Sequence, residues 1–193
     1  MINPYKPLPW SVVIDGKEIG MDMSFNNILD IYDTLNDKTL SEGERMFLAL
    51  HMLLDEVPEY ELAEHYVTLW NELYDKFIKN PDAEMPVVTD IKGNPMPSLD
   101  EESGPSFDLK QDMSYIFSSF MFDYGLNLVQ QQNKLHWHEF NSLLNGLSDD
   151  CRLRKVIGIR QMELPPVGKT PEEIKHYHAV VKMKKMVALK ERD

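Results

Sequence analysis

Cysteine is almost absent from this chain of 193 residues, because Cys151 is the only one. A single thiol excludes an intrachain disulfide and any zinc or iron–sulfur site held by several cysteines. Long apolar runs are also missing, since no stretch approaches the roughly 18 apolar residues that cross a bilayer. Residues 1–10 carry three prolines instead of a basic and then apolar signal sequence. We therefore expect a protein of the cytoplasm, without membrane association.

Basic residues are scarce relative to acidic ones. The chain has 20 Lys and Arg against 32 Asp and Glu, which gives a formal net charge of -12 and a pI near 4.9. This balance argues against broad nucleic-acid binding, which needs clustered basic side chains to neutralise phosphates. The charge is unevenly distributed, however: residues 151–193 hold 11 of the 20 basic side chains and only five of the 32 acidic ones. The C-terminal segment is thus basic in an acidic protein.

The patterns that are present predict a mainly α-helical domain with a small N-terminal β-hairpin. At the hairpin, β-branched residues flank Asp15-Gly16, a pair that tolerates the positive φ angles of a two-residue turn. Apolar residues then recur at three- and four-residue spacing over most of the chain, which is typical of amphipathic helices. With 42% hydrophobic residues, a chain of this length can bury a substantial core.

Seven helices are predicted from these stripes and from their end signals. Ser24 is a potential N-cap for the first, Ser41 and Glu44 form a capping-box pattern for the second, and Pro58 fits the first turn of the third. Asp108 and Gly125 are expected to cap the fourth. The predicted ranges, taken in order, are 24–35, 41–54, 58–79, 108–124, 133–145, 148–161 and 170–192, and the later half of the sixth is compatible with either helix or strand.

Periodicity is lost between residues 80 and 106, where five of the twelve prolines lie among acidic and small residues. Such a long segment without a structural pattern is uncommon inside a compact domain. We interpret it as a Pro-rich acidic linker between an N-terminal part, residues 1–79, and a C-terminal helical part, residues 107–193.

Catalytic and nucleotide-binding motifs are incomplete. Gly168-Lys169-Thr170 resembles the end of a phosphate-binding loop, but Glu163 stands where that motif needs its first glycine. Cys151 and the serines lie in no recognisable nucleophile motif. We expect no enzyme activity and no cofactor.

Histidines offer a metal-site alternative that we disfavour. His136 and His138, like His176 and His178, are two residues apart, which in a helix directs them to different faces. A site assembled across helices from His136, His138, Glu139 and His176 would make the protein a metal-dependent enzyme. Partly buried or surface histidines are the commoner outcome, so we predict no metal.

The chain is rich in methionine, with 12 residues, and aromatic side chains gather on the predicted fourth helix. Methionine adapts to irregular partners, although most of these residues should simply pack the core. Phe122 lies off the main apolar stripe, and the last helix is both amphipathic and basic. We therefore predict that Phe122, Lys182, Lys184 and Lys185 contact a partner.

A longer pattern resembles the gene-product-15 family of phages and prophages of Gram-positive bacteria. The resemblance covers nearly the whole chain and includes the Asp15-Gly16-Lys17 turn. Its most specific part is His136-Trp137-x-x-Phe140-x-x-Leu143-Leu144-x-Gly146-Leu147, although His138 replaces an aromatic residue that often follows the Trp. Other matching residues are Phe107-Asp108, Tyr115-Ile116, Phe120, the segment Tyr124-Gly125-Leu126-Asn127-Leu128, Leu135, Asn145 and Ile159-Arg160-Gln161-Met162.

The resemblance implies a tail assembly chaperone of long, flexible-tailed phages (siphophages). Such a protein is expected to bind the tape measure protein, to help recruit tail tube subunits, to self-associate or coat its client in the host cytoplasm, and to be absent from the finished virion. The alternative is a structural minor tail or connector protein that remains in the virion. For the chaperone, we expect Trp137 and Phe140 to pack the C-terminal core and not to contact the client.

Overall fold

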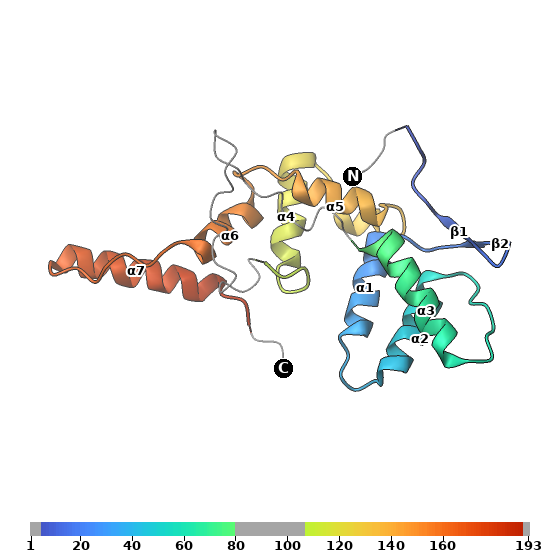
Figure 1. The fold of residues 1–193 in the computed structure, drawn as a ribbon. Helices are drawn as coiled ribbons and strands as arrows, with labels where there is room; N and C mark the ends of the chain where they lie inside the picture. Colours follow the sequence, from blue (N-terminus) through green and yellow to red (C-terminus); the bar gives the residue numbers. More distant parts are fainter. Residues whose placement is uncertain (1–4, 80–106, 191–193) are drawn as a thin grey trace, which may run out of the picture. The chain divides into compact units, whose positions relative to one another are not determined.

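The computed structural model describes residues 5–79 and 107–190, and these are mainly α-helical with one two-stranded hairpin, as predicted (Figure 1). The described residues divide into two compact units. Unit 1 contains residues 5–79 together with Leu128–Asn145, and unit 2 contains residues 107–127 and 146–190. The predicted linker, residues 80–106, lies outside the described residues. The sequence grouped residues 128–145 with the C-terminal part, whereas their contacts group them with unit 1.

The hairpin opens unit 1. Strands β1 (Ser11–Ile14) and β2 (Lys17–Gly20) pair antiparallel, with Ile14 opposite Lys17 and Ser11 opposite Gly20. Asp15 and Gly16 have φ angles of 51° and 79°, which is the left-handed conformation that a type I′ turn requires at both positions. The predicted hairpin and its turn are confirmed.

Three helices follow in unit 1: α1 (Phe25–Leu35), α2 (Glu42–Leu53) and α3 (Ala63–Leu73), which continues as a π-helical turn, η1 (Tyr74–Ile78). Helix α2 packs against both α1 and α3 (Figure 1). The predicted capping box is present, since the Ser41 hydroxyl accepts from the Glu44 N–H and the Glu44 carboxylate accepts from the Ser41 N–H. The prediction that Pro58 begins the third helix is wrong, because residues 57–62 are not helical and α3 starts at Ala63.

Helix α5 (Trp137–Asn145) completes unit 1 after the short 3-10 helix η3 (Leu128–Gln131). Its entry pairs antiparallel with the entry of α1: the Phe25 N–H donates to the Leu135 carbonyl, and the Trp137 N–H donates to the Met23 carbonyl. The buried Trp137 and Phe140 therefore pack the core of unit 1. The prediction that they pack a C-terminal core is wrong, because the periodicity of an apolar stripe indicates that a helix face is buried but not which helix it packs against.

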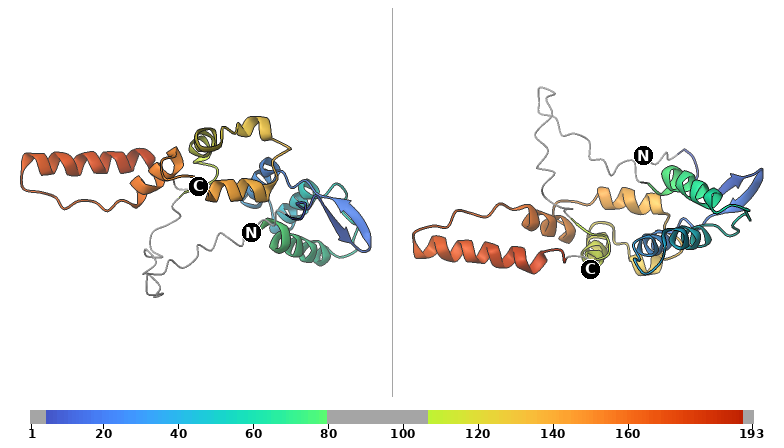
Figure 2. Two further views of the ribbon diagram at one scale, coloured as in Figure 1. Left: turned by 90° about the horizontal axis from the view of Figure 1, so that it is seen from above. Right: turned by 60° about the horizontal axis from the view of Figure 1, so that its bottom comes forward.

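Unit 2 consists of α4 (Met113–Tyr124), α6 (Arg152–Gln161) and α7 (Pro171–Val187), in which α6 packs against both α4 and α7 (Figure 2). Gly125 ends α4 in the left-handed conformation, as predicted. The ambiguous segment is helical up to Gln161. The buried Ser119 hydroxyl accepts from the Leu153 N–H at 2.9 Å, which joins the start of α6 to α4.

Three helix ends differ from the predictions in unit 2, and one of them is the start of α6, which lies at Arg152 and not at Ser148. Helix α4 is N-capped at Asp112 and not at Asp108, although the Asp108 carboxylate accepts the N–H groups of Lys110 and Gln111 just upstream. Helix α7 has the predicted Thr170–Glu173 capping box and Pro171 in its first turn, but it ends at Val187. Among the described residues, no helix has the length and apolar character needed to span a membrane.

Candidate functional site

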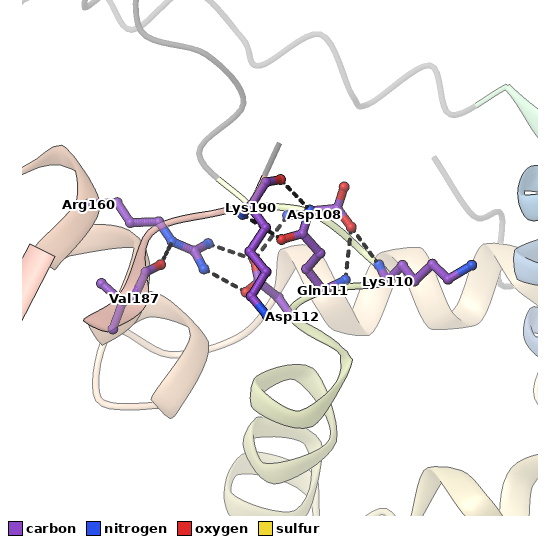
Figure 3. A network of polar contacts seen from close by, with 7 residues as sticks. All are labelled: Asp108, Lys110, Gln111, Asp112, Arg160, Val187 and Lys190. Atoms are coloured by element: carbon purple, nitrogen blue, oxygen red, sulfur yellow. Dashed lines mark hydrogen bonds and ion pairs between the residues drawn. The ribbon is translucent and has the colours of Figure 1, made fainter. Parts of the chain in front are cut away.

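A buried ion pair organises the basic end of unit 2 (Figure 3). The Arg160 guanidinium, near the end of α6, donates from two nitrogens to the two carboxylate oxygens of Asp112, each at 2.6 Å. The side chains are 11% and 2% exposed, respectively. Arg160 Nε also donates to the Val187 carbonyl at 2.5 Å, at the last residue of α7. One guanidinium thus links the start of α4 to the ends of α6 and α7.

The surroundings of this pair favour its charged form. Burial alone would raise the pKa of Asp112, but the Arg160 hydrogen bonds, a bond from the Asp108 N–H and the Arg160 charge outweigh burial and hold the pKa below its usual value. The hydrogen bonds to Asp112 also raise the pKa of Arg160. Both groups are therefore ionised at neutral pH.

A second contact fixes the chain just beyond α7. The Gln111 side-chain amide donates to the Lys190 carbonyl at 2.9 Å and accepts from the Lys190 N–H at 2.8 Å (Figure 3). This reciprocal pairing reproduces the pattern of a β-ladder with a side chain. Together, Arg160 and Gln111 hold the basic end of α7 against the rest of unit 2.

The outer side of α7 combines apolar and basic side chains. Lys182, Met183, Lys185 and Met186 lie within one turn of each other and are all exposed, and Met186 is 74% exposed. We call these four residues the Met–Lys face. The opposite side of α7 carries Val180, which is buried. The helix therefore packs through one side and presents adaptable methionines flanked by charges on the other.

The three lysines predicted to bind a partner are not equivalent. Lys182 and Lys185 belong to the Met–Lys face. Lys184 is half-buried, and its ammonium group donates to the Met162 carbonyl in the segment that runs back along α7 (Figure 2). Lys184 therefore contributes to packing of α7, and its replacement would disturb the helix as well as the charge.

Phe122 occupies a different place. It lies in the last turn of α4, is 68% exposed, and has the exposed Met121 beside it. The end of α7 is held near Asp112, at the start of α4, ten residues earlier in the same helix. Ten residues of α-helix span about 15 Å. The predicted contact residues thus form two separate patches of unit 2.

His136 and His138 in unit 1 have structural roles. His136 precedes α5, so its ring lies 5.1 Å from that of His138 instead of on an opposite helix face, as the sequence suggested. His136 Nε2 lies 3.0 Å from the Pro9 carbonyl, and its Nδ1 accepts the His138 N–H. His138 Nε2 bonds to the Phe77 carbonyl at 2.7 Å. These bonds occupy both ring nitrogens of His136 and the Nε2 of His138, which a metal would otherwise use.

Metal and phosphate sites find little support in the part of the chain that the structure describes. No group of three or more His, Cys, Asp or Glu side chains there could hold a metal ion. At the phosphate-loop-like turn, the Glu173 carboxylate accepts the N–H groups of Lys169 and Thr170, the amides that a phosphate would use. Cys151 is buried at the N-cap of α6.

The sequence missed the Asp112–Arg160 pair. Arg160 belongs to the segment that carries the family resemblance, and Asp112 stands just before the α4 stripe, but no local pattern connects residues on two helices. The one available signal was an arginine within the otherwise apolar series Val156, Ile157 and Ile159, at a position that the helical period places toward the packed side.

Comparison with known proteins gave one match. The family model described as "Bacteriophage Gp15 protein" matches residues 5–189, nearly the whole chain. Neither curated proteins nor solved structures gave a match.

Proposed function

Since the chain belongs to the bacteriophage Gp15 protein family, it is a phage-related protein, and we propose that it acts as a tail assembly chaperone. In this proposal it is a binding protein without enzyme activity. It holds the tape measure protein soluble in the host cytoplasm, assists recruitment of tail tube subunits, and leaves before the virion is complete.

The Met–Lys face is the observation that carries the proposal. A chaperone for a long helical client needs a surface that tolerates many side-chain shapes, and exposed methionines provide one because their unbranched side chains re-pack readily. Lys182 lies about one turn before Met186, and Lys185 directly precedes it. Apolar contact would supply affinity, and the two ammonium groups would favour acidic stretches of the client.

The site is also held in place before any partner arrives. The Arg160 and Gln111 contacts fix the end of α7 on unit 2, so binding would not have to order this part of the helix. A preorganised surface loses less conformational entropy on association. Phe122 offers a second apolar contact for a long client helix, and it lies about 15 Å along α4 from Asp112.

Co-expression tests the proposal directly. The tape measure protein of the same phage is expressed alone and together with the tagged protein, and its soluble, co-purifying fraction is measured. We expect the client to be insoluble alone and to co-purify when both are present. A client that stays insoluble would contradict the proposal, as would finding this protein by mass spectrometry in purified virions, which would indicate a minor tail or connector protein.

Variants then separate the face from bulk charge. Lys182→Glu with Lys185→Glu should reduce co-purification and its salt dependence, and Met183→Gln with Met186→Gln should reduce it at any salt concentration. The matched control is Lys38→Glu with Lys134→Glu, which makes the same charge change at exposed positions of unit 1. If the control variant reduced co-purification equally, the Met–Lys face would not be the binding site.

A further inference from the structure

Unit 1 contains a groove that belongs to none of the features above. It lies between β1 on one side and α3 with η1 on the other, and it encloses about 400 Å³. The helical wall is formed by residues that recur at three- and four-residue spacing, so a single helix face lines it. These residues are His65, Thr68, Leu69, Glu72, Leu73, Lys76 and Phe77.

The strand wall has an unused edge. In the hairpin register, Ile14 and Val12 form the hydrogen-bonded pairs with Lys17 and Ile19, which places the backbone N–H and C=O of Val13 on the outer edge of β1. Within residues 5–79 and 107–190, no backbone or side-chain group bonds to them. The equivalent edge of β2 is occupied, since the Gly20 carbonyl accepts from the Asp55 N–H at 3.0 Å.

An open strand edge beside a groove selects the shape of its occupant. Only an extended backbone can pair with both the N–H and the C=O of Val13 while lying along β1. The buried Leu69, Leu73 and Phe77 at the groove wall favour apolar side chains on the inward side of such a strand. Successive residues of a strand point to opposite sides, so apolar residues are needed at every second position.

The charged side chains at the groove determine which charge the bound segment should carry. Asp15 accepts a hydrogen bond from the Tyr60 hydroxyl at 3.2 Å, and Glu72 lies close enough to act on the same hydroxyl electrostatically. Glu72 has no ion-pair partner among the described residues. Lys76 is instead placed over the Phe77 ring, 4.9 Å from its centroid. The carboxylates of Asp15 and Glu72 would therefore attract a Lys or Arg side chain.

We propose that the groove between β1 and α3 binds an extended segment of a partner protein, which adds a strand to the free edge of β1 at Val13. The segment is apolar at alternate positions and carries a basic residue beside Asp15 and Glu72. This site is in unit 1 and does not depend on the chaperone proposal, which uses α7 and α4 of unit 2.

The test uses the full-length protein and a fluorescent ten-residue peptide of alternating valine and lysine, with binding followed by fluorescence polarisation. Val13→Pro removes the edge N–H at a position where proline is tolerated in an edge strand, and Val13→Thr is the matched control that keeps it. We expect Val13→Pro to weaken binding at least about tenfold and Val13→Thr to leave it within about twofold. Glu72→Gln should weaken binding by about threefold in low salt.

Two further measurements keep the result decisive. A peptide with N-methylated amides at alternate positions cannot pair with a strand edge, so it should not bind. Hydrogen exchange of the wild-type protein should show the Val13 amide protected by the unmodified peptide, whether or not Val13→Pro folds. Equal binding of the methylated peptide, unchanged exchange at Val13, or occupation of this edge by a second copy of the chain in solution would each overturn the proposal.

Discussion

The ring of Phe25, at the start of α1, stacks on the ring of Phe140 in α5, with centroids 5.0 Å apart and planes 11° from parallel. Trp137 also stacks on Phe140, with ring centroids 5.7 Å apart. The Trp137 indole N–H donates to the Ile78 carbonyl at the end of η1. The last carbonyl groups of a helix have no partners within the helix. Helix α5 therefore supplies both apolar contact and a cap to the rest of unit 1.

Replacing the buried Phe140 should destabilise the protein far more than replacing the exposed Phe122. Phe140→Ala should lower the free energy of unfolding by about 3–5 kcal/mol, because it leaves a cavity at a fully buried site. Phe122→Ala, at an exposed site, should change it by less than about 0.5 kcal/mol. Urea denaturation followed by circular dichroism measures both, and similar losses for the two variants would contradict the assigned core.

Removing one member of the Asp112–Arg160 pair should cost more than removing both. Asp112→Asn or Arg160→Met alone leaves a buried group without its partner, which destabilises by about 3–5 kcal/mol. The double variant should be destabilised by clearly less than the sum of the single changes. A double-mutant cycle from urea unfolding gives the coupling energy. Strictly additive effects would show that the two groups do not interact in solution.

Unit 1 should lose stability in mild acid because of His136. Burial lowers the pKa of His136, and the nearby His138 lowers it further, while the Pro9 carbonyl and Glu139 partly oppose this. The contribution of His136 is therefore complete above its unfolded pKa of about 6.5 and is lost as the pH falls from there through the folded pKa. Protonation at Nδ1 would also break the bond from the His138 N–H.

Tryptophan fluorescence suits this measurement, because all three tryptophans, Trp10, Trp70 and Trp137, belong to unit 1. The urea concentration at the unfolding midpoint should decrease when the pH is lowered from 7.5 to 5.5. This decrease should be smaller in His136→Gln than in the wild type. Direct NMR titration of His136 supplies an independent check. A pKa at or above the ordinary histidine value would rule out this account.

The division into units predicts which fragments fold. A chain that ends at residue 79 lacks Trp137 and Phe140, so we expect no cooperative unfolding transition. A variant in which a flexible Gly/Ser linker replaces residues 80–127, and which ends at residue 145, retains every element of unit 1 and should unfold cooperatively. Cooperative unfolding of the shorter fragment would show that α5 is dispensable.

Local features of this fold could be predicted from sequence because they depend on neighbouring residues. The Asp15-Gly16 turn, the two capping boxes and the Gly125 end of α4 each follow from backbone conformation or hydrogen bonding within a few positions. Pro58 was misassigned because a first-turn proline is permitted in a helix but does not start one.

Long-range partners could not be predicted in the same way. The stripe in α5 identified Phe140 as buried, but its contact with Phe25 depends on how distant segments assemble. The proposed Lys184 contact illustrates the same limit, since its bond to the Met162 carbonyl arises from the path of the segment before α7. The free edge at Val13 also became visible only when the register of the hairpin and the place of α3 were known.

The position of α5 in the chain has a consequence for biosynthesis. Unit 1 begins with the hairpin but closes with residues 137–145, so the ribosome makes α4 before the unit that started first can be completed. Until α5 emerges, the apolar faces of α1 and η1 have no cover from Trp137 and Phe140. Vectorial synthesis therefore leaves the nascent chain with exposed core surface for much of its translation, and slow translation upstream of residue 137 should prolong its exposure to proteases and host chaperones.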